Sequence, residues 1–532
     1  MLLTFFSRAI EQGIPVMADY NMERFASGFF TQDADLRTLV AYDSRATESQ
    51  TQQQGSLARA MAQVWALPLR SDGTPPLCGL FGGTGLNSSL LYKYAGTHGW
   101  TAAGVVPGGT YQNSGGNTNC GFATTDLYVA VGSGRTAYSD GTSANGNVGS
   151  WLPGIHTETG TYPGVDVWGG NPFMGRECSA RYVYLGAGSA GPTDMALRAI
   201  RSVDFWTSIN TLTRTAYVGA DVAITLDGSG VGYQDVSCGS GPGLPGVVLR
   251  NPSGSTTGSG PLRIFHQGVR IFRSSGGVPI QGWHLGAYGT GGHTIGQALA
   301  CIGQSGYSGL SPDPYFTSAN ASALYQAGWG RTSGANGPNK VICYTGANFA
   351  SDEQTELAAG TTTTYRNRHI AWIDAVTALC SALNGGAEPD ICIVFTEAIR
   401  NTYSGRMYTT ALKAVIEAAA ARRQSVCDLF TRTNTKDTSL STPWADPFEP
   451  PFQKGNVYQN TNTASSGPVK LSGGNIDFVH HSRVGDQIIA MMIWQSMAAS
   501  LGISDSFNVA YPAATIGDNP RNRFTRSEQR GF

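Results

Sequence analysis

Two patterns of apolar and polar residues alternate along this chain, and they predict two kinds of element. Short, nearly continuous apolar runs are typical of strands buried on both faces, whereas apolar residues spaced three or four apart are typical of helices with one buried face. The runs occur at 36–42, 283–288, 340–344, 390–395 and 426–429, and the helical spacing at 48–67, 365–383, 407–423 and 488–501. Because strands and helices alternate, we expect an α/β fold with a parallel sheet covered on both faces.

Residues 71–281 have a different pattern, rich in glycine and poor in long apolar runs. Turn-forming stretches such as 253–260 separate short segments in which apolar and polar residues alternate, at 202–206, 222–226 and 262–266. Several short strands separated by turns predict an inserted all-β, sandwich-like domain. The expected division is therefore a lead-in at 1–35, a discontinuous α/β domain at 36–70 and 282–505, the β-rich insertion at 71–281 and a tail at 506–532.

Composition narrows the class of protein. Of the 532 residues 70 are glycine, charged residues make up only 13%, and the net charge is −1. This balance favours an extracellular or virion-associated, loop-rich protein. It argues against a nucleic-acid partner, because there is no basic field to attract phosphates. No apolar run approaches the roughly 20 residues of a membrane span, and the first residues lack the pattern of a signal peptide.

The nine cysteines fall into two groups. Those in apolar helix or strand patterns, which we expect to be small buried side chains, are Cys301, Cys343, Cys380, Cys392 and Cys427. Those in glycine-rich segments, where disulfide pairing stays open, are Cys78, Cys120, Cys178 and Cys238. Since there is no Cys-X-X-Cys or Cys/His zinc pattern, the sequence predicts no metal site, and it implies no cofactor.

The strongest candidate for chemistry is the segment 475–482, just before the last predicted helix. Asp477 lies three residues before His480, and a carboxylate so close can orient an imidazole and leave its other nitrogen free as a base. Ser44, Gly292 and Asn348 each lie at or beyond the end of a predicted strand. Because functional groups collect at the carboxyl ends of parallel strands, these positions are candidates for one site.

Together these positions resemble the SGNH (GDSL-type) hydrolase family, esterases on a flavodoxin-like three-layer α/β/α fold. The family blocks Gly-Asp-Ser, Gly-Thr/Ser, Gly-X-Asn-Asp and Asp-X-X-His-Pro are similar, in that order, to Tyr42-Asp43-Ser44, Gly292-His293-Thr294, Gly346-Ala347-Asn348-Phe349 and Asp477-Phe478-Val479-His480-His481. The resemblance covers residues 36–70 and 282–502, with the β-rich insertion between the first two blocks.

The resemblance implies a role for each matching position. Ser44 would be the nucleophile, His480 its base and Asp477 the residue that orients the base, because a serine hydroxyl is a weak nucleophile until its proton is removed. The backbone N–H groups of Ser44 and Gly292 and the side-chain amide of Asn348 would form the oxyanion hole. Each such donor is typically worth about 3–4 kcal/mol in the transition state.

Three positions depart from the family pattern. Tyr42 replaces glycine in the first block, Phe349 replaces the second aspartate of the third block, and His481 replaces proline in the last block. The last change leaves two adjacent candidates for the base, of which the Asp-X-X-His spacing favours His480.

Several other residues have ordinary structural interpretations. Glu353 and Glu397 lie near predicted strand ends, which leaves two interpretations, lining the cleft or lying on solvated loops, and we expect the second. The insertion contains tryptophans that either pin loops and core or form platforms for sugar rings, namely Trp100, Trp151, Trp168 and Trp206.

The sequence thus predicts a serine esterase that removes O-acetyl or similar short acyl groups from a polysaccharide. The ester class follows from the resemblance, and the carbohydrate follows from the inserted β-rich stretch with its polar, aromatic-bearing loops. The alternative is a structural or receptor- or glycan-binding component of a phage particle or surface assembly, with a weak or inactive hydrolase fold. We expect the tail to dock on a partner or on a neighbouring copy in a homo-oligomer or larger assembly, because it has little apolar periodicity and contains Arg521, Arg523, Arg526 and Arg530.

Overall fold

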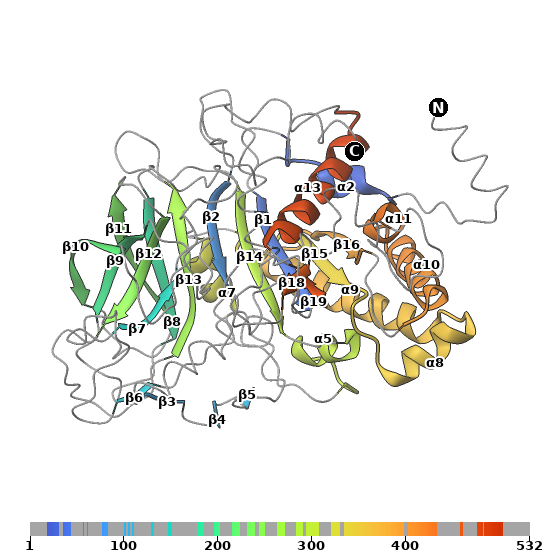
Figure 1. Ribbon diagram of the computed structural model, residues 1–532, viewed down its shortest axis with the longest axis horizontal. Coiled ribbons are helices and arrows are strands. Elements are labelled where there is room, and N and C mark those ends of the chain that lie inside the picture. The colour runs from blue at the N-terminus through green and yellow to red at the C-terminus, as the bar shows by residue number, and fades with distance from the viewer. Residues whose placement is uncertain are drawn as a thin grey trace.

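The structure is a computed structural model (Figure 1). It describes the residues Leu57 and Met61 and the ranges 19–30, 36–43, 77–82, 100–102, 105–106, 109–110, 129–131, 147–151, 178–185, 196–202, 215–223, 231–239, 244–250, 263–271, 283–290, 294–307, 321–329, 335–397, 403–433, 458–460, 476–481 and 483–503. The expected tail at 506–532 and most of the lead-in at 1–35 lie outside these residues.

A nine-stranded sheet, with the order β11-β8-β13-β2-β14-β1-β15-β16-β17, organises the molecule. Five neighbouring strands at one end of this order run parallel to one another. They are β14 (Trp283–Thr290), β1 (Leu36–Asp43), β15 (Lys340–Thr345), β16 (Asp390–Phe395) and β17 (Ser425–Asp428). These are the five strands that the apolar runs predict, and their parallel arrangement confirms the expected α/β fold.

The β-rich stretch contributes further strands to the same sheet. Next to β14 lies β2 (Leu77–Gly82), which is parallel to it, followed by the antiparallel strands β13 (Arg263–Ile271), β8 (Cys178–Leu185) and β11 (Val231–Gly239). A separate four-stranded sheet contacts β8 and β11. It consists of β10 (Thr215–Ala223), β9 (Ala196–Ser202), β12 (Leu244–Arg250) and β7 (Asn147–Trp151). The domain boundaries at 71 and 281 stay a prediction.

Three small two-stranded sheets complete the strands that the structure describes. They pair β3 (Trp100–Ala102) with β6 (Val129–Val131), β4 (Val105–Val106) with β5 (Gly109–Thr110), and β18 (Tyr458–Asn460) with β19 (Ile476–His481).

Helices follow most of the parallel strands. Those described are α2 (Met22–Ala26), α5 (Ile295–Cys301), α7 (Ala321–Trp329), α8 (Ser351–Ala359), α9 (Thr363–Leu383), α10 (Gly405–Ala421), α11 (Leu429–Thr433) and α13 (Arg483–Ser500). The predicted helices at 365–383, 407–423 and 488–501 correspond to α9, α10 and α13. In the predicted helix 48–67, Leu57 and Met61 are helical and fully buried.

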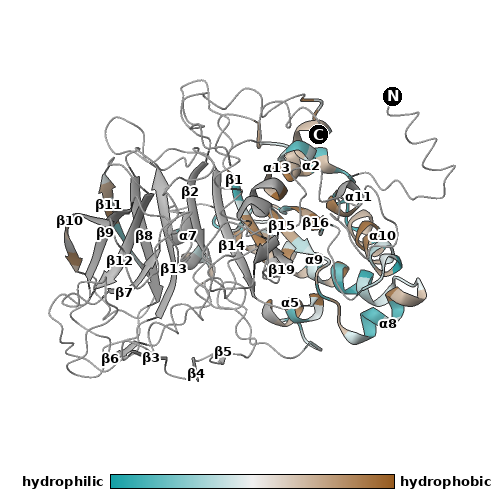
Figure 2. Ribbon diagram, viewed as in Figure 1, coloured by the Kyte–Doolittle hydropathy of each residue, from teal (hydrophilic) through white to brown (hydrophobic). Residues whose placement is uncertain are grey.

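The core lies where helices cover the parallel strands. Strand β16 contacts both α2 and α10, while α9 contacts α5, α8 and α10. Residues such as Ile342 and Ile393 on the central strands are therefore fully buried, and each such side chain gives about 1.5–3 kcal/mol of transfer free energy. Figure 2 shows the contrast between hydrophobic β15 and the hydrophilic residues of α8. Of the predicted buried cysteines, Cys343, Cys380, Cys392 and Cys427 are buried.

An ion-pair network joins the N-terminal segment to the sheet. Asp390, at the start of β16, accepts hydrogen bonds from Arg24 Nε at 2.8 Å and from Lys340 Nζ at 2.7 Å. The Lys340 ammonium also lies 5.6 Å and 5.9 Å from the ring centroids of Phe25 and Phe29. Burial lowers the pKa of Lys340, and the nearby Asp390 carboxylate opposes this effect. The network therefore holds α2 against strands that are more than 300 residues away in the sequence.

Helices long and apolar enough to cross a lipid bilayer do not occur among the described residues.

Candidate active site

The carboxyl ends of three neighbouring parallel strands meet at one edge of the sheet. Strand β1 lies between β14 and β15, and near their carboxyl ends Asp43 is in register with Thr290 and Tyr42 with Tyr344. The loops that continue from these strands therefore begin side by side.

The predicted oxyanion-hole positions follow these three strand ends in the sequence. Ser44 comes directly after β1 and Gly292 two residues after β14, and both lie outside the described residues. Asn348 comes three residues after β15 and is described. The structure thus brings together the strands that precede all three positions, and the roles of Ser44 and Gly292 stay predictions.

The predicted base and its orienting carboxylate both lie on β19. The backbone of this strand is described and pairs with β18, where Tyr458 is in register with His481 and Asn460 with Ile476. Helix α13 begins two residues after β19, as expected for the segment containing Asp477 and His480. Their hydrogen bonds to each other and to Ser44 stay a prediction, as does the choice between the two histidines.

The side chain of Asn348 is available for a new hydrogen bond. Its neighbours Ala347 and Phe349 are 2% and 4% exposed, whereas Asn348 itself is half-buried. Within the described part of the chain, its amide makes no hydrogen bond. Because a carboxamide offers two N–H donors, Asn348 has the chemistry of an oxyanion ligand.

A glycine makes the turn that aims this loop. Gly346 has a φ of +103°, a backbone conformation that residues other than glycine rarely adopt. A Cβ atom there would lie 2.8 Å from Thr396 Cγ2 and 2.9 Å from Phe395 Cε2 on the neighbouring strand. Both the backbone conformation and the close neighbours therefore require glycine as the first residue of the Gly-X-Asn block.

A buried hydrogen-bonded chain holds the start of the loop against α9. The His369 Nδ1–H donates to the Tyr365 carbonyl oxygen at 2.9 Å, since a carbonyl only accepts. Nε2 then carries the lone pair and accepts from Thr345 Oγ1 at 3.2 Å, while Thr345 Oγ1 accepts from the Tyr365 hydroxyl at 3.0 Å. Burial lowers the pKa of His369 from 6.5 to about 4, and the Tyr365 contact opposes this shift. The imidazole is thus neutral at neutral pH.

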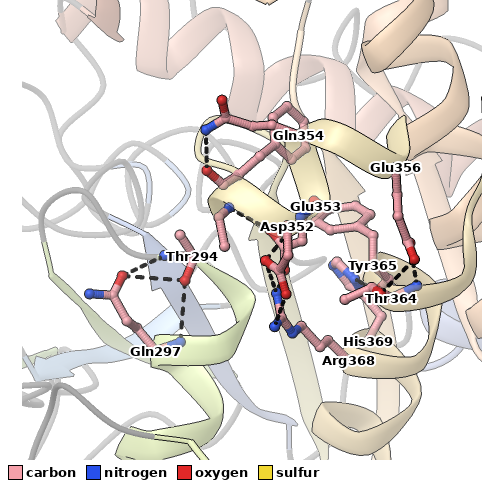
Figure 3. A network of polar contacts seen from close by, with 12 residues as sticks. Thr294, Gln297, Asp352, Glu353, Gln354, Glu356, Thr364, Tyr365, Arg368 and His369 are labelled. Atoms are coloured by element: carbon pink, nitrogen blue, oxygen red, sulfur yellow. Dashed lines mark hydrogen bonds and ion pairs between the residues drawn. The ribbon is translucent and has the colours of Figure 1, made fainter. Parts of the chain in front are cut away.

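A second polar network holds the end of the loop (Figure 3). Fully buried Glu353 accepts the Ala350 N–H on Oε2 at 2.7 Å and Arg368 Nη1 on Oε1 at 2.7 Å. Arg368 also pairs with Asp352, with Nη2 to Oδ2 at 2.6 Å. Burial raises the pKa of Glu353, and its contact with Arg368 opposes this shift. Burial alone would lower the pKa of Arg368, but the two carboxylates outweigh it and raise the pKa.

The helix that follows the predicted Gly292 position has a complete N-terminal cap. Thr294 Oγ1 accepts the Gln297 N–H at 3.4 Å, and Gln297 Oε1 accepts the Thr294 N–H at 2.9 Å. This capping box fixes the point at which the chain leaves β14 and enters α5. Figure 3 shows it beside the network of α8 and α9.

Two glutamates contradict the expectation of solvated loops. Glu353 lies in the first turn of α8 and Glu397 follows β16, and both are fully buried. Glu397 Oε2 accepts hydrogen bonds from the Tyr344 hydroxyl and, at 3.1 Å, from Thr396 Oγ1. The expectation was wrong because each carboxylate has donors from neighbouring elements, which an isolated polar residue in a sequence does not reveal.

Sequence reasoning also missed the residues that support the loop from α9. Tyr365, Arg368 and His369 lie inside a predicted helix, where only the i, i+4 spacing of Tyr365 and His369 on its buried face was available as a signal. As for metals, the described residues contain no cluster of three or more potential ligands.

Comparisons with known proteins give distant structural likenesses. No protein-family model and no curated protein matches the chain. Among solved structures, the YxiM protein of Bacillus subtilis has 10% identity and a TM-score of 0.26, over 62% of this chain and 79% of that chain. A family two carbohydrate esterase from Clostridium thermocellum, in complex with cellohexaose, has 9% identity and a TM-score of 0.24, over 62% and 92% of the two chains. At these values the likenesses carry no argument about activity.

Proposed function

We propose that this chain is a serine esterase of the SGNH type that hydrolyses short acyl esters, O-acetyl groups on carbohydrate in particular. One observation carries the proposal. The strands preceding Ser44, Gly292 and Asn348 are adjacent and parallel, and the Asn348 amide at their shared edge has no hydrogen bond within the described residues. A nucleophile and its oxyanion donors must lie close together, and adjacent parallel strands bring their following residues to the same edge of the sheet.

In the acylation step, Ser44 Oγ attacks the ester carbonyl carbon while His480 takes the hydroxyl proton. The N–H groups of Ser44 and Gly292 and the Asn348 amide stabilise the tetrahedral oxyanion. The intermediate then loses the bond between the carbonyl carbon and the sugar oxygen, and His480 returns the proton to that oxygen. The sugar leaves as an alcohol, and the acyl group stays on Ser44.

In the deacylation step, His480 accepts a proton from water as the water oxygen attacks the acyl-enzyme. The second tetrahedral intermediate uses the same donors. Its collapse breaks the bond between the acyl carbon and Ser44 Oγ, His480 gives the proton it took from water to Oγ, and a carboxylic acid is released. Asp477 holds the imidazole in the required tautomer and stabilises its protonated form. No redox step or external cofactor is needed.

The carbohydrate substrate class rests on the β-rich stretch 71–281 and its aromatic residues, and the proposed extracellular or virion-associated location rests on the glycine-rich composition with few charged residues. A second copy or a larger assembly as partner rests on the arginine-bearing tail.

The proposal is tested by hydrolysis of p-nitrophenyl acetate and of chemically acetylated xylan. The intact chain, Ser44→Ala and His480→Ala are compared with two matched controls, Ser305→Ala at an exposed turn and His481→Ala. We expect turnover in the intact chain and both controls, and loss of at least about 1,000-fold in the two triad variants. An inert intact chain would instead favour a binding or structural component on a retired hydrolase fold. Loss in His481→Ala alone would transfer the role of the base to His481.

A further inference from the structure

Two of the proposed oxyanion donors belong to loops that follow different strands. The Gly292 loop continues from β14 into α5, and the Asn348 loop continues from β15 into α8. An oxyanion hole requires donors at fixed separation, since displacing a group by about 1 Å can cost about 100-fold in rate. Something must therefore fix α5 and α8 relative to each other.

Arg368 of α9 lies between the first turns of these two helices. Its Cζ atom lies 3.9 Å from the position that a Cβ atom would take on Gly296, in the first turn of α5. On the other side its Nη1 contacts Glu353 Oε1 in the first turn of α8. Helix α9 contacts both α5 and α8, and Figure 3 shows the guanidinium between them.

Glu353 connects Arg368 to the loop that carries Asn348. One of its oxygens binds Arg368 and the other accepts the backbone N–H of Ala350, two residues after Asn348. The Glu353 side chain is completely buried, whereas the Asp352 side chain, which binds the same guanidinium, is 53% exposed. Of these two carboxylates, Glu353 is the one that also accepts a backbone N–H of the loop.

We propose that the Arg368–Glu353 ion pair is a positioning device that sets the loop carrying Asn348 relative to α5, the helix that follows the Gly292 position in the sequence. This inference rests on the proposed esterase function. A buried ion pair is weak evidence for stability, because its desolvation offsets much of its attraction. This pair differs from a surface pair because the buried Glu353 carboxylate binds both Arg368 of α9 and the Ala350 N–H of the loop, while the guanidinium is within van der Waals distance of the Cβ position of Gly296 in α5.

The first test compares two variants that each remove one carboxylate charge from the same arginine. Glu353→Gln keeps the size of the side chain but places an amide N–H against the guanidinium, whereas Asp352→Asn changes only the exposed partner. With p-nitrophenyl acetate we expect kcat to fall about 10- to 100-fold in Glu353→Gln, with KM within about twofold. In Asp352→Asn we expect both constants within about threefold of the intact chain.

A double-mutant cycle separates positioning from general damage. If Glu353 acts through Asn348, Glu353→Gln adds little further loss in an Asn348→Ala background, because the group that it positions is absent. If the two losses multiply, the pair does not act through Asn348, and the inference is wrong.

Arg368→Lys provides a second test of the ion pair, which holds even if the Glu353→Gln variant does not fold. It keeps the positive charge but loses the forked contact, so we expect a fall in kcat of about tenfold with an unchanged circular dichroism spectrum. An active intact chain in which both Glu353→Gln and Arg368→Lys match Asp352→Asn would overturn the inference and leave the esterase proposal standing. An inert intact chain would instead reject the esterase proposal itself.

Discussion

At the scale of single residues, the most informative side chain is the one with spare hydrogen-bonding capacity. The Asn348 amide is half-buried between two buried neighbours and makes no hydrogen bond within the described residues. A carboxamide has two N–H donors, so this amide can bind a transient acceptor such as a developing oxyanion.

We expect Asn348→Ala to lower kcat for ester hydrolysis about 100- to 1,000-fold, because an oxyanion donor acts mainly in the transition state. Steady-state kinetics check this result, with exposed Asn367→Ala on α9 as the matched control. An Asn348→Ala variant as active as Asn367→Ala would remove Asn348 from the oxyanion hole.

His369 makes stability depend on pH. Its pKa is lowered to about 4 in the folded state from 6.5, so between these values the unfolded chain binds a proton that the folded chain does not. Stability is therefore lost as pH falls from about 6.5 to about 4, by roughly 3 kcal/mol at most.

We expect His369→Gln to remove this component, so that the difference in unfolding free energy between the two chains shrinks as pH falls through that window. Urea unfolding at pH 7, 6, 5 and 4 measures it. A difference that stays constant with pH would show that His369 does not titrate in this way.

At the scale of elements, the turn after β15 depends on one glycine. Gly346→Ala places a methyl group 2.8 Å from Thr396 Cγ2 at a φ of +103°, and we expect a loss of at least about 2 kcal/mol of unfolding free energy. Gly386→Ala is the matched control, because its φ is +99° and no atom lies within 4 Å of the added Cβ. It isolates the backbone strain of about 1–2 kcal/mol. Equal losses in the two variants would argue against the close packing at Gly346.

The sequence predicts those elements in which the pattern of buried positions gives a clear repeat of apolar residues. Strands β15 and β16 are buried along their length and read as apolar runs, and α10 has apolar residues on one face. Helix α8 was missed because only Glu353 and Leu357 are buried in it, so its sequence has no apolar stripe. Its buried Glu353 instead has a partner on another helix, Arg368 of α9, and a contact between distant elements leaves no periodic signal in the sequence.

At the scale of the whole molecule, the apolar runs predict parallel strands but not the order in which they pair. The sheet order places β1 between β14 and β15 although hundreds of residues separate β1 from both. The family resemblance at Ser44, Gly292 and Asn348 implies that these strands are neighbours. The periodicity of apolar residues indicates which positions are buried but not which strands pair. The strands that extend the sheet beyond β14 were not anticipated, because alternating patterns do not reveal a pairing partner.

The N-terminal segment and the parallel sheet are joined by the network around Asp390. We expect Asp390→Asn to lower the unfolding free energy by about 3 kcal/mol, because it leaves the Lys340 ammonium, only 5% exposed, without its counter-charge. Denaturant unfolding measures this loss. The control is Asp374→Asn, whose pair with Arg422 is 48% and 40% exposed and is worth about 0–1 kcal/mol. Similar losses in both variants would show that Lys340 does not depend on Asp390.

The central claim, that this fold carries a serine nucleophile at the end of β1, is tested most directly by covalent labelling. The intact chain is treated with a fluorophosphonate, which phosphonylates activated serines, and the modified peptide is identified by mass spectrometry. We expect one adduct, on Ser44, that is absent from Ser44→Ala and strongly reduced in His480→Ala. No adduct on the intact chain, or an adduct on a different serine, would contradict the account.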